Sequence, residues 1–267
     1  MVRVTVAGIP VWVDAGRLLG PGEWEEDASG GWSALLDRRQ AADVQARLRG
    51  WGIGGTPLVT TVVPPLKRPL VRQARADEAV RRRARTPGFL RRGTRLDREG
   101  QVSLTPEALA MTMAERVAGL SVVDATAGAG GNAIAFARHD CRVVAIEPQA
   151  ERRRLLEHNA RLYGVRDRIQ IVAGRAPNDL PKPADLLFID VPWGTEYDPN
   201  RVVLDDLPLL ADILQATSHW PRVWAKLPPS FDVTTLAGTP EAWFGVAPGD
   251  RQRVKFIVIE VAREVSG

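Results

Sequence analysis

The chain of 267 residues is poor in the side chains that form disulfides or bind metals, because it has one cysteine, Cys141, and three histidines. A single cysteine excludes an intramolecular disulfide, so we expect a reducing, cytoplasmic setting. The same scarcity argues against a structural zinc site, and we expect no metal. No apolar run approaches the ~20 residues of a membrane span, and residues 1–4 do not begin a signal-peptide core, so we expect no membrane partner.

Lysine is also scarce, and the positive charge lies mainly on arginine. The formal net charge is only +4, yet eleven Lys or Arg residues fall between Lys67 and Arg95, against two acids, Asp77 and Glu78. Such a block is typical of proteins with a polyanionic partner, since phosphate contacts dominate the affinity for nucleic acid. A solvated helix face has the same composition, and the sequence leaves both interpretations open.

The composition divides the chain into three parts: a small α/β element over residues 1–65, a basic connector over 66–100 and a larger domain over 101–267. The connector is expected to be helical over 69–85, because Pro87-Gly88 follows and breaks a helix.

Three patterns describe the first part. Alternating valines over residues 1–14, around Gly8-Ile9-Pro10, predict a short hairpin. The apolar spacing over 32–49 predicts a helix that ends at Gly50, and the run 58–63 predicts a strand.

Helices alternate with apolar strands after residue 101, which predicts an α/β fold with a mostly parallel, doubly wound sheet of seven strands. Thr105 as N-cap and Pro106 in the first turn predict where the first helix starts. The last two strands are joined only by Pro248-Gly249-Asp250, which predicts an antiparallel final strand. The helices are expected at 106–118, 131–138, 149–163 and 202–217, and the strands at 121–125, 142–147, 168–173, 185–190, 222–226, 242–246 and 254–262.

A glycine-rich loop runs from Asp124 to Asn132 (Asp-Ala-Thr-Ala-Gly-Ala-Gly-Gly-Asn), between a strand and a helix. Such glycines let the backbone approach a ligand at the carboxyl end of a strand, although a tight connection alone also uses them. Asp124 would repel a pyrophosphate but pair with the ammonium of a methionine moiety. Glu147, at the end of the next strand, is placed to accept both ribose hydroxyls. The order along the chain, an acid, then the glycines and then a second acid, favours S-adenosylmethionine over NAD as the ligand.

A third contact with the cofactor is expected where strand 168–173 ends, at Gly174 and Arg175. Many enzymes of this kind hold the adenine amine with an acid there, whereas Arg175 leaves adenine to backbone groups and apolar packing. The predicted cofactor-binding residues are Thr105, Asp124, Ala125, Gly128, Gly130, Asn132, Glu147, Pro148, Gly174, Arg175 and Asp190.

The segment Asp190-Val191-Pro192-Trp193-Gly194 ends an apolar run and predicts a platform for a flat, amine-bearing ring. Acceptors at the Asp190 carboxylate and the Val191 carbonyl would favour the pyramidal nitrogen of a methyl-transfer transition state, and Trp193 would stack on the ring. A Pro turn with a packed Trp is the structural alternative. The predicted catalytic residues are Asp190, Val191, Pro192 and Trp193, and the predicted substrate-binding residues are Trp193, Gly194, Lys226 and Pro228.

Over roughly residues 66–230 the sequence resembles the trimethylguanosine synthases, the RNA cap guanine-N2 methyltransferases. The likeness is carried by Leu96 to Glu107 (Leu-Asp-Arg-Glu-Gly-Gln-Val-Ser-Leu-Thr-Pro-Glu), by the loop from Asp124 to Asn132 and by the segment from Asp190 to Gly194. The resemblance implies a Rossmann-like class I methyltransferase fold and transfer of a methyl group from S-adenosylmethionine to the exocyclic amine of a guanine. In the family the motif Trp stacks on 7-methylguanine, a role that falls here to Trp193.

The function expected from these features is N-methylation of a guanine-type base in RNA or a nucleotide. One alternative is methylation of another ring amine, such as adenine in DNA or rRNA or a small nitrogen heterocycle of secondary metabolism. A second is a noncatalytic RNA-binding protein on a methyltransferase fold; the presence of Asp124, Glu147, Asp190 and Trp193 argues against it.

Overall fold

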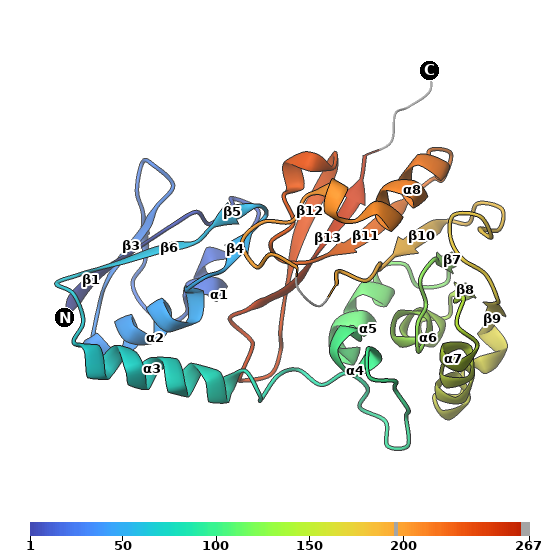
Figure 1. Ribbon diagram of the computed structural model, residues 1–267, viewed down its shortest axis with the longest axis horizontal. Helices are drawn as coiled ribbons and strands as arrows, with labels where there is room; N and C mark the ends of the chain where they lie inside the picture. Colours follow the sequence, from blue (N-terminus) through green and yellow to red (C-terminus); the bar gives the residue numbers. More distant parts are fainter. Residues whose placement is uncertain (195–196, 263–267) are drawn as a thin grey trace. The chain divides into compact units, whose positions relative to one another are not determined.

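The computed structural model describes residues 1–194 and 197–262 (Figure 1). The chain forms two compact units, each built from separate segments. The first unit comprises residues 1–86, 194–206 and 228–257, and the second comprises residues 87–193, 207–227 and 258–267. The boundaries expected at residues 65 and 100 follow composition, whereas these units follow contacts within the folded chain.

The first unit contains a four-stranded sheet of order β2-β3-β1-β6, in which neighbouring strands are antiparallel. Val2, Val4 and Val6 alternate into its core, which also holds Leu36 and Val62. The elements before residue 87 are β1 (Val2–Ala7), α1 (Ala15–Leu19), β2 (Glu25–Glu26), β3 (Trp32–Leu36), α2 (Arg38–Leu48), β4 (Gly52–Ile53), β5 (Thr56–Pro57), β6 (Val59–Val63) and α3 (Arg68–Arg81).

Two expectations for this unit are wrong. Residues 1–14 form no hairpin, because β1 pairs with β3 and β6 instead, and Val11 is almost fully exposed. Residues 32–49 form a strand and then a helix. The helix begins only after Asp37, whose carboxylate accepts the backbone N–H groups of Arg39 and Gln40 in a capping box. The strand over 58–63 is confirmed as β6.

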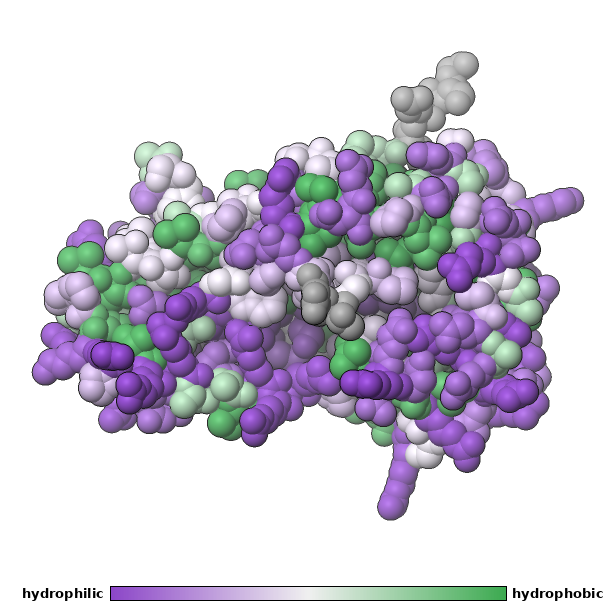
Figure 2. All heavy atoms as spheres, viewed as in Figure 1, coloured by the Kyte–Doolittle hydropathy of each residue, from purple (hydrophilic) through white to green (hydrophobic). Residues whose placement is uncertain are grey.

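The basic connector forms the helix α3, which is shorter than expected and has Pro69 in its first turn. Hydrophilic side chains predominate on the surface over α3, with a few apolar ones between them (Figure 2). Val80 of this helix is exposed. Glu78 is an exception among the charged residues of α3, because its side chain is buried.

A seven-stranded sheet has the order β12-β13-β11-β10-β7-β8-β9. The pairs β11–β10, β10–β7, β7–β8 and β8–β9 are parallel, which confirms the predicted class I fold with a mostly parallel sheet. The elements after residue 87 are α4 (Gly100–Ser103), α5 (Glu107–Glu115), β7 (Ser121–Asp124), α6 (Gly131–Arg138), β8 (Arg142–Ile146), α7 (Ala150–Leu162), β9 (Ile169–Val172), β10 (Leu186–Ile189), α8 (Pro208–Ala216), β11 (Val223–Leu227), β12 (Gly238–Phe244) and β13 (Val254–Val261), with short 3-10 turns at Arg166–Arg168, Leu204–Asp206 and Val233–Thr235.

Strand order reverses between β7 and β10, because the chain continues from β7 to β8 on one side and returns through β10 on the other. In open α/β sheets ligands bind outside the carboxyl ends of the strands at such a switch point. β10 is fully buried, and its Phe188 packs edge-to-face on Phe136 of α6, with ring centroids 5.3 Å apart. The sheet therefore brings the ends of β7 and β10 together on a rigid base.

Two helix starts differ from expectation. The N-cap of α5 is Pro106, and Thr105 makes no capping bond because its hydroxyl is used elsewhere. The helix expected over 202–217 begins at Pro208, after the 3-10 turn Leu204–Asp206. In the described part of the chain no helix is both long and apolar enough to cross a membrane.

Candidate active site

Four neighbouring strands of the second unit end at one edge of the sheet and carry charged side chains there. Asp124 ends β7, Glu147 follows β8, Asp190 follows β10 and Lys226 lies near the end of β11. The register pairs Asp124 with Phe188 and Ala145, so the ends of β7, β8 and β10 are level. Residues separated by more than 100 positions are thus gathered by parallel pairing.

The glycine-rich loop leaves space at its centre. Gly128 and Gly130 adopt positive φ angles of 52° and 95°, which side chains rarely tolerate. A Cβ at Gly128 would have no other heavy atom within 4 Å, whereas one at Gly130 would lie 2.9 Å from Leu156. Gly130 is therefore fixed by packing against α7, and Gly128 borders open space.

Asp124 is fully buried, and among the described residues only one of its carboxylate oxygens has a hydrogen-bond partner. Oδ1 accepts the backbone N–H of Thr126 at 3.3 Å, while Oδ2 has no hydrogen-bond partner among the described residues. Burial, with added repulsion from Asp190 and Glu147, raises the pKa of Asp124 to about 7. Oδ1 of Asn132 is likewise buried without a partner. A buried cation with N–H donors would satisfy both groups.

Glu147 is held by backbone donors. Its Oε2 accepts the N–H of Gly128 at 3.1 Å, and its Oε1 accepts the N–H of Gln149 at 2.7 Å. Each oxygen retains a lone pair for another donor. With Asp124, this carboxylate therefore matches a ligand that has an ammonium and vicinal hydroxyls, and these residues fit S-adenosylmethionine.

Asp190 is the centre of a polar cluster. Lys226 donates to both of its carboxylate oxygens, at 3.0 Å to Oδ1 and 2.8 Å to Oδ2. Asn132 Nδ2 donates to Oδ2 at 3.1 Å, and the Thr105 hydroxyl lies 3.4 Å from the same oxygen. The Asp190 backbone N–H donates to Thr126 Oγ1 at 2.9 Å. Oδ2 therefore has three donors, whereas Oδ1 has one among the described residues.

Lys226 joins this carboxylate to the predicted aromatic platform. Its ammonium lies 4.9 Å from the ring centroid of Trp193, and its side chain is 3% exposed. From the sequence, Lys226 could either line the rim of the substrate pocket or simply end a strand, because no neighbouring residue indicates its partner. Trp193 is half-buried, Val191 is buried and Pro192 is exposed.

The other predicted residues occupy the same strand ends, with two exceptions. Ala125 is buried after β7, and Pro148 follows Glu147 with its carbonyl accepting from Arg153. Gly194, with a φ of 82°, and Pro228 begin segments of the first unit. Their part in the site stays a prediction.

Asp179 is an acid that the sequence analysis missed. Its Oδ2 accepts the backbone N–H of Arg175 at 2.8 Å, and a Cβ at Gly174 would lie 2.5 Å from the Asp179 side chain. The carboxylate therefore folds back onto the loop after β9, where the sequence offered Arg175 and adenine was expected to contact backbone groups and apolar side chains. Its position five residues after Gly174 gave no local signal.

Comparison with known proteins places this site in a family context. The family model described as RNA cap guanine-N2 methyltransferase matches residues 120–208. The chain is 32% identical over 161 residues to trimethylguanosine synthase of Schizosaccharomyces pombe, covering 54% of this chain and 67% of that protein. It is 46% identical over 59 residues to ribosomal RNA small subunit methyltransferase G of Frankia casuarinae, a match that covers 21% of this chain and 22% of that protein.

A solved structure shares the fold. The match is to a protein of Porphyromonas gingivalis W83 described as a methyltransferase, with a TM-score of 0.53 and 18% identity. It covers 72% of this chain and 49% of that one.

Proposed function

Because the chain belongs to the RNA cap guanine-N2 methyltransferase family and is a methyltransferase, we propose that it methylates the exocyclic N2 amine of a guanine in RNA. The observation that carries the proposal is the cluster of Asp190, Lys226 and Trp193 at the switch point of the sheet. An acceptor beside an aromatic ring suits an amine on a flat base.

The amine of guanine is a weak nucleophile because its lone pair is delocalised into the ring. An acceptor at the amine hydrogens favours the pyramidal nitrogen needed for attack. Oδ1 of Asp190, which has one donor against three on Oδ2, is the oxygen proposed for this role. The donors on Oδ2 hold the carboxylate in one orientation, and the amine proton leaves after methyl transfer.

Trp193 is proposed to stack on the guanine. The Lys226 ammonium beside its ring already engages the π-system as a cation. A second cation on the same ring would be repelled, so the platform is better matched to a neutral guanine than to the positively charged 7-methylguanine of a cap. We therefore propose an internal or terminal unmodified guanine as the acceptor.

S-adenosylmethionine is the proposed donor, and when bound it supplies an electrophilic methyl group. Asp124 and Asn132 would hold its methionine end, and Glu147 its ribose hydroxyls. Asp179, held against the Gly174 loop, would accept the adenine amine, a contact that the sequence had left to backbone groups and apolar packing. The sulfonium and the ammonium would also neutralise the repulsion among Asp124, Glu147 and Asp190.

The proposed reaction is tested with RNA oligonucleotides that differ by one amine. We expect radiolabelled methyl transfer to an oligonucleotide with a single guanosine and none to the matched oligonucleotide with inosine, which lacks only the N2 amine. Nucleoside mass spectrometry should identify N2-methylguanosine. A 7-methylguanosine-capped oligonucleotide without other guanines should be a poorer acceptor.

Equal labelling of the inosine oligonucleotide would contradict N2 methylation. Labelling of adenosine instead would support the alternative ring amine. Cofactor binding without transfer to RNA, DNA or nucleotides would support a noncatalytic protein.

The role of Glu147 gives a second prediction. Glu147→Ala should weaken S-adenosylmethionine binding by roughly 1–3 kcal/mol, the loss expected for hydrogen bonds to a charged acceptor. Isothermal titration calorimetry measures this loss. Glu151→Ala, at an exposed position of α7, is the matched control and should bind like the unmodified protein. Unchanged affinity in Glu147→Ala would mean that the ribose lies elsewhere.

A further inference from the structure

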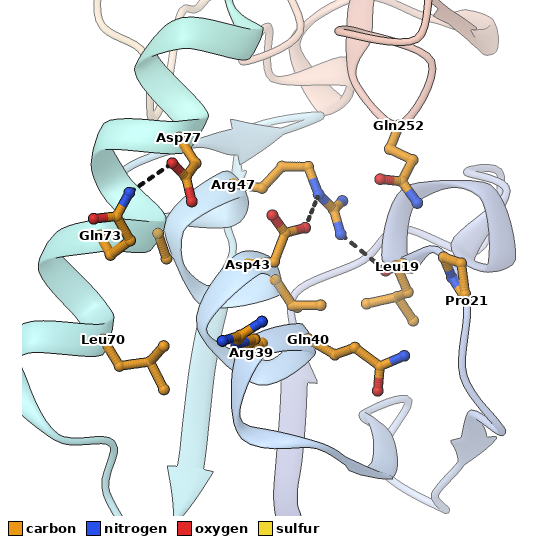
Figure 3. A pocket seen from close by; sticks show the side chains of 12 residues that line it. Leu19, Pro21, Arg39, Gln40, Asp43, Arg47, Leu70, Gln73, Asp77 and Gln252 are labelled. Atoms are coloured by element: carbon orange, nitrogen blue, oxygen red, sulfur yellow. Dashed lines mark hydrogen bonds and ion pairs between the residues drawn. The ribbon is translucent and has the colours of Figure 1, made fainter.

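One cavity of the first unit, of about 610 Å³, lies beside α2 and α3 (Figure 3). Its described lining has two cations, Arg39 and Arg47, and two carboxylates, Asp43 and Asp77. Figure 3 shows the Arg47 side chain turned toward Asp43, and Gln73 donating to Asp77. The charges of this lining balance, so the cavity does not select one class of ligand. Selective groups lie instead around Asp190 in the second unit.

Thr126 lies in the glycine-rich loop and joins the ends of β7 and β10. Its backbone N–H donates to Oδ1 of Asp124 at 3.3 Å, and its Oγ1 accepts the backbone N–H of Asp190 at 2.9 Å. Under the proposed function Asp124 holds the methionine end of the cofactor, and Asp190 accepts from the amine of the base. Thr126 therefore contacts the anchors of both reactants.

The hydroxyl of Thr126 can donate a hydrogen bond as well as accept one. Its oxygen accepts from the Asp190 N–H, whereas no described residue accepts its hydrogen. The side chain is partly exposed, at the edge of the sheet where the charged strand ends gather. The hydroxyl hydrogen is therefore available to a ligand beside Asp190.

The other polar side chains around Asp190 have a different role. Lys226 and Asn132 donate to the Asp190 carboxylate, and the Thr105 hydroxyl lies 3.4 Å from its Oδ2. These three groups orient the carboxylate. Among the described side chains of this cluster, Thr126 alone contacts the backbone of Asp190, which leaves its donor for the base.

The amine of guanine lies between two ring nitrogens with opposite hydrogen-bonding character. N1 carries a hydrogen and donates, whereas N3 has a lone pair and accepts. A site with an acceptor for the amine and a donor beside it therefore matches the edge of guanine that carries N2 and N3. Oδ1 of Asp190 is the proposed acceptor, and the Thr126 hydroxyl, held by the backbone of the same residue, is the donor beside it.

We propose that Thr126 is a specificity-determining residue of the methyl transfer, whose hydroxyl donates to N3 of the guanine while Asp190 accepts from the N2 amine. The proposal rests on the proposed function, in that N2 of guanine is the acceptor of the methyl group. Two hydrogen bonds to adjacent positions of the base prevent its rotation within its own plane. The amine is then held in line with the methyl donor.

The test uses RNA with a single guanosine and the matched RNA with 3-deazaguanosine, in which a C–H group replaces N3 and the amine is kept. Thr126→Val preserves the shape of the side chain but removes the hydroxyl. The ratio of kcat/KM between the two RNAs should fall about tenfold from the unmodified protein to Thr126→Val, as for one lost hydrogen bond. Dividing one ratio by the other cancels the different intrinsic reactivity of the two amines.

Three further variants serve as controls. Thr126→Ser keeps the hydroxyl and should keep the ratio of the unmodified protein. Thr126→Ala removes the hydroxyl without the bulk of valine and should give the same ratio as Thr126→Val. Thr105→Val removes the hydroxyl near Oδ2 and should lower kcat/KM equally on both RNAs, so that the ratio is retained.

An unchanged ratio in Thr126→Val and Thr126→Ala would overturn the N3 contact. An equal fall of the ratio in Thr105→Val would also overturn it, because any disturbance of Asp190 would then have the same effect. Calorimetry should show S-adenosylmethionine binding by Thr126→Val within about threefold of the unmodified protein, because the N–H that reaches Asp124 is retained. Loss of cofactor affinity in step with activity would instead identify Thr126 as a structural residue of the loop.

The two proposals fail in different ways. Absence of methyl transfer from the unmodified protein to the guanosine RNA would overturn the proposed function and the N3 contact together. Transfer to guanosine with the same ratio in all variants would overturn the N3 contact alone. Thermal unfolding of each variant verifies that it is folded.

Discussion

Trp193→Ala should lower methyl transfer to RNA at least about a hundredfold while changing the affinity for S-adenosylmethionine by no more than a few fold. The loss has two sources: base–aromatic stacking contributes roughly 1–3 kcal/mol, and a base that is no longer held misaligns its amine. Because the ring is only half-buried, its removal should not collapse the core. Steady-state kinetics and calorimetry on the same preparations measure the two quantities.

Trp193→Phe is the matched control, because it keeps an aromatic face beside Lys226. It should retain a substantial part of the activity. Parallel loss of cofactor affinity, thermal stability and activity in Trp193→Ala would instead identify Trp193 as a packing residue.

Asp124→Asn should abolish most cofactor binding and yet stabilise the protein without cofactor at pH 8. The native pKa of Asp124 is about 7, against 3.8 for an unperturbed carboxyl. Between these values the folded protein holds a proton that the unfolded chain has lost, so stability falls as pH rises through this window. With each pKa unit equal to about 1.4 kcal/mol, the fall is up to about 4 kcal/mol.

Asparagine does not ionise, so the variant should lose this pH dependence. Its thermal midpoint at pH 8 should exceed that of the unmodified protein by up to about 10 °C, and the Kd for S-adenosylmethionine should rise about a hundredfold, as for a lost charged contact. Asp167→Asn removes the same charge from an exposed position and should change neither quantity. Lower stability of Asp124→Asn at pH 8 would mean that the carboxylate has a stabilising partner.

Local sequence patterns were sufficient to predict a helix or strand where the residues of that element alone determine it. The helix at 131–138 is found with the predicted bounds, because Gly130 and Gly131 begin it and Asp140 ends it with a positive φ. The buried strand β10 is confirmed because four consecutive apolar residues leave little alternative inside a sheet. The helix expected over 32–49 is confirmed over Arg38–Leu48 and wrong over Trp32–Leu36, because Trp32 and Leu36 fit both the helical and the strand period and only pairing with β1 decides for the strand.

The sequence by itself determined the mostly parallel sheet and the positions of Asp124, Glu147 and Asp190 at the ends of its strands, since hydrophobic period and glycine turns are local properties. The tertiary structure decided that Lys226 pairs with Asp190, that the Thr105 hydroxyl approaches the same carboxylate instead of capping a helix, and that Asp179 folds back onto the Gly174 loop. These contacts join side chains that are distant in sequence, or turn one back on its own loop, and no local pattern encodes which partner a buried charge will find.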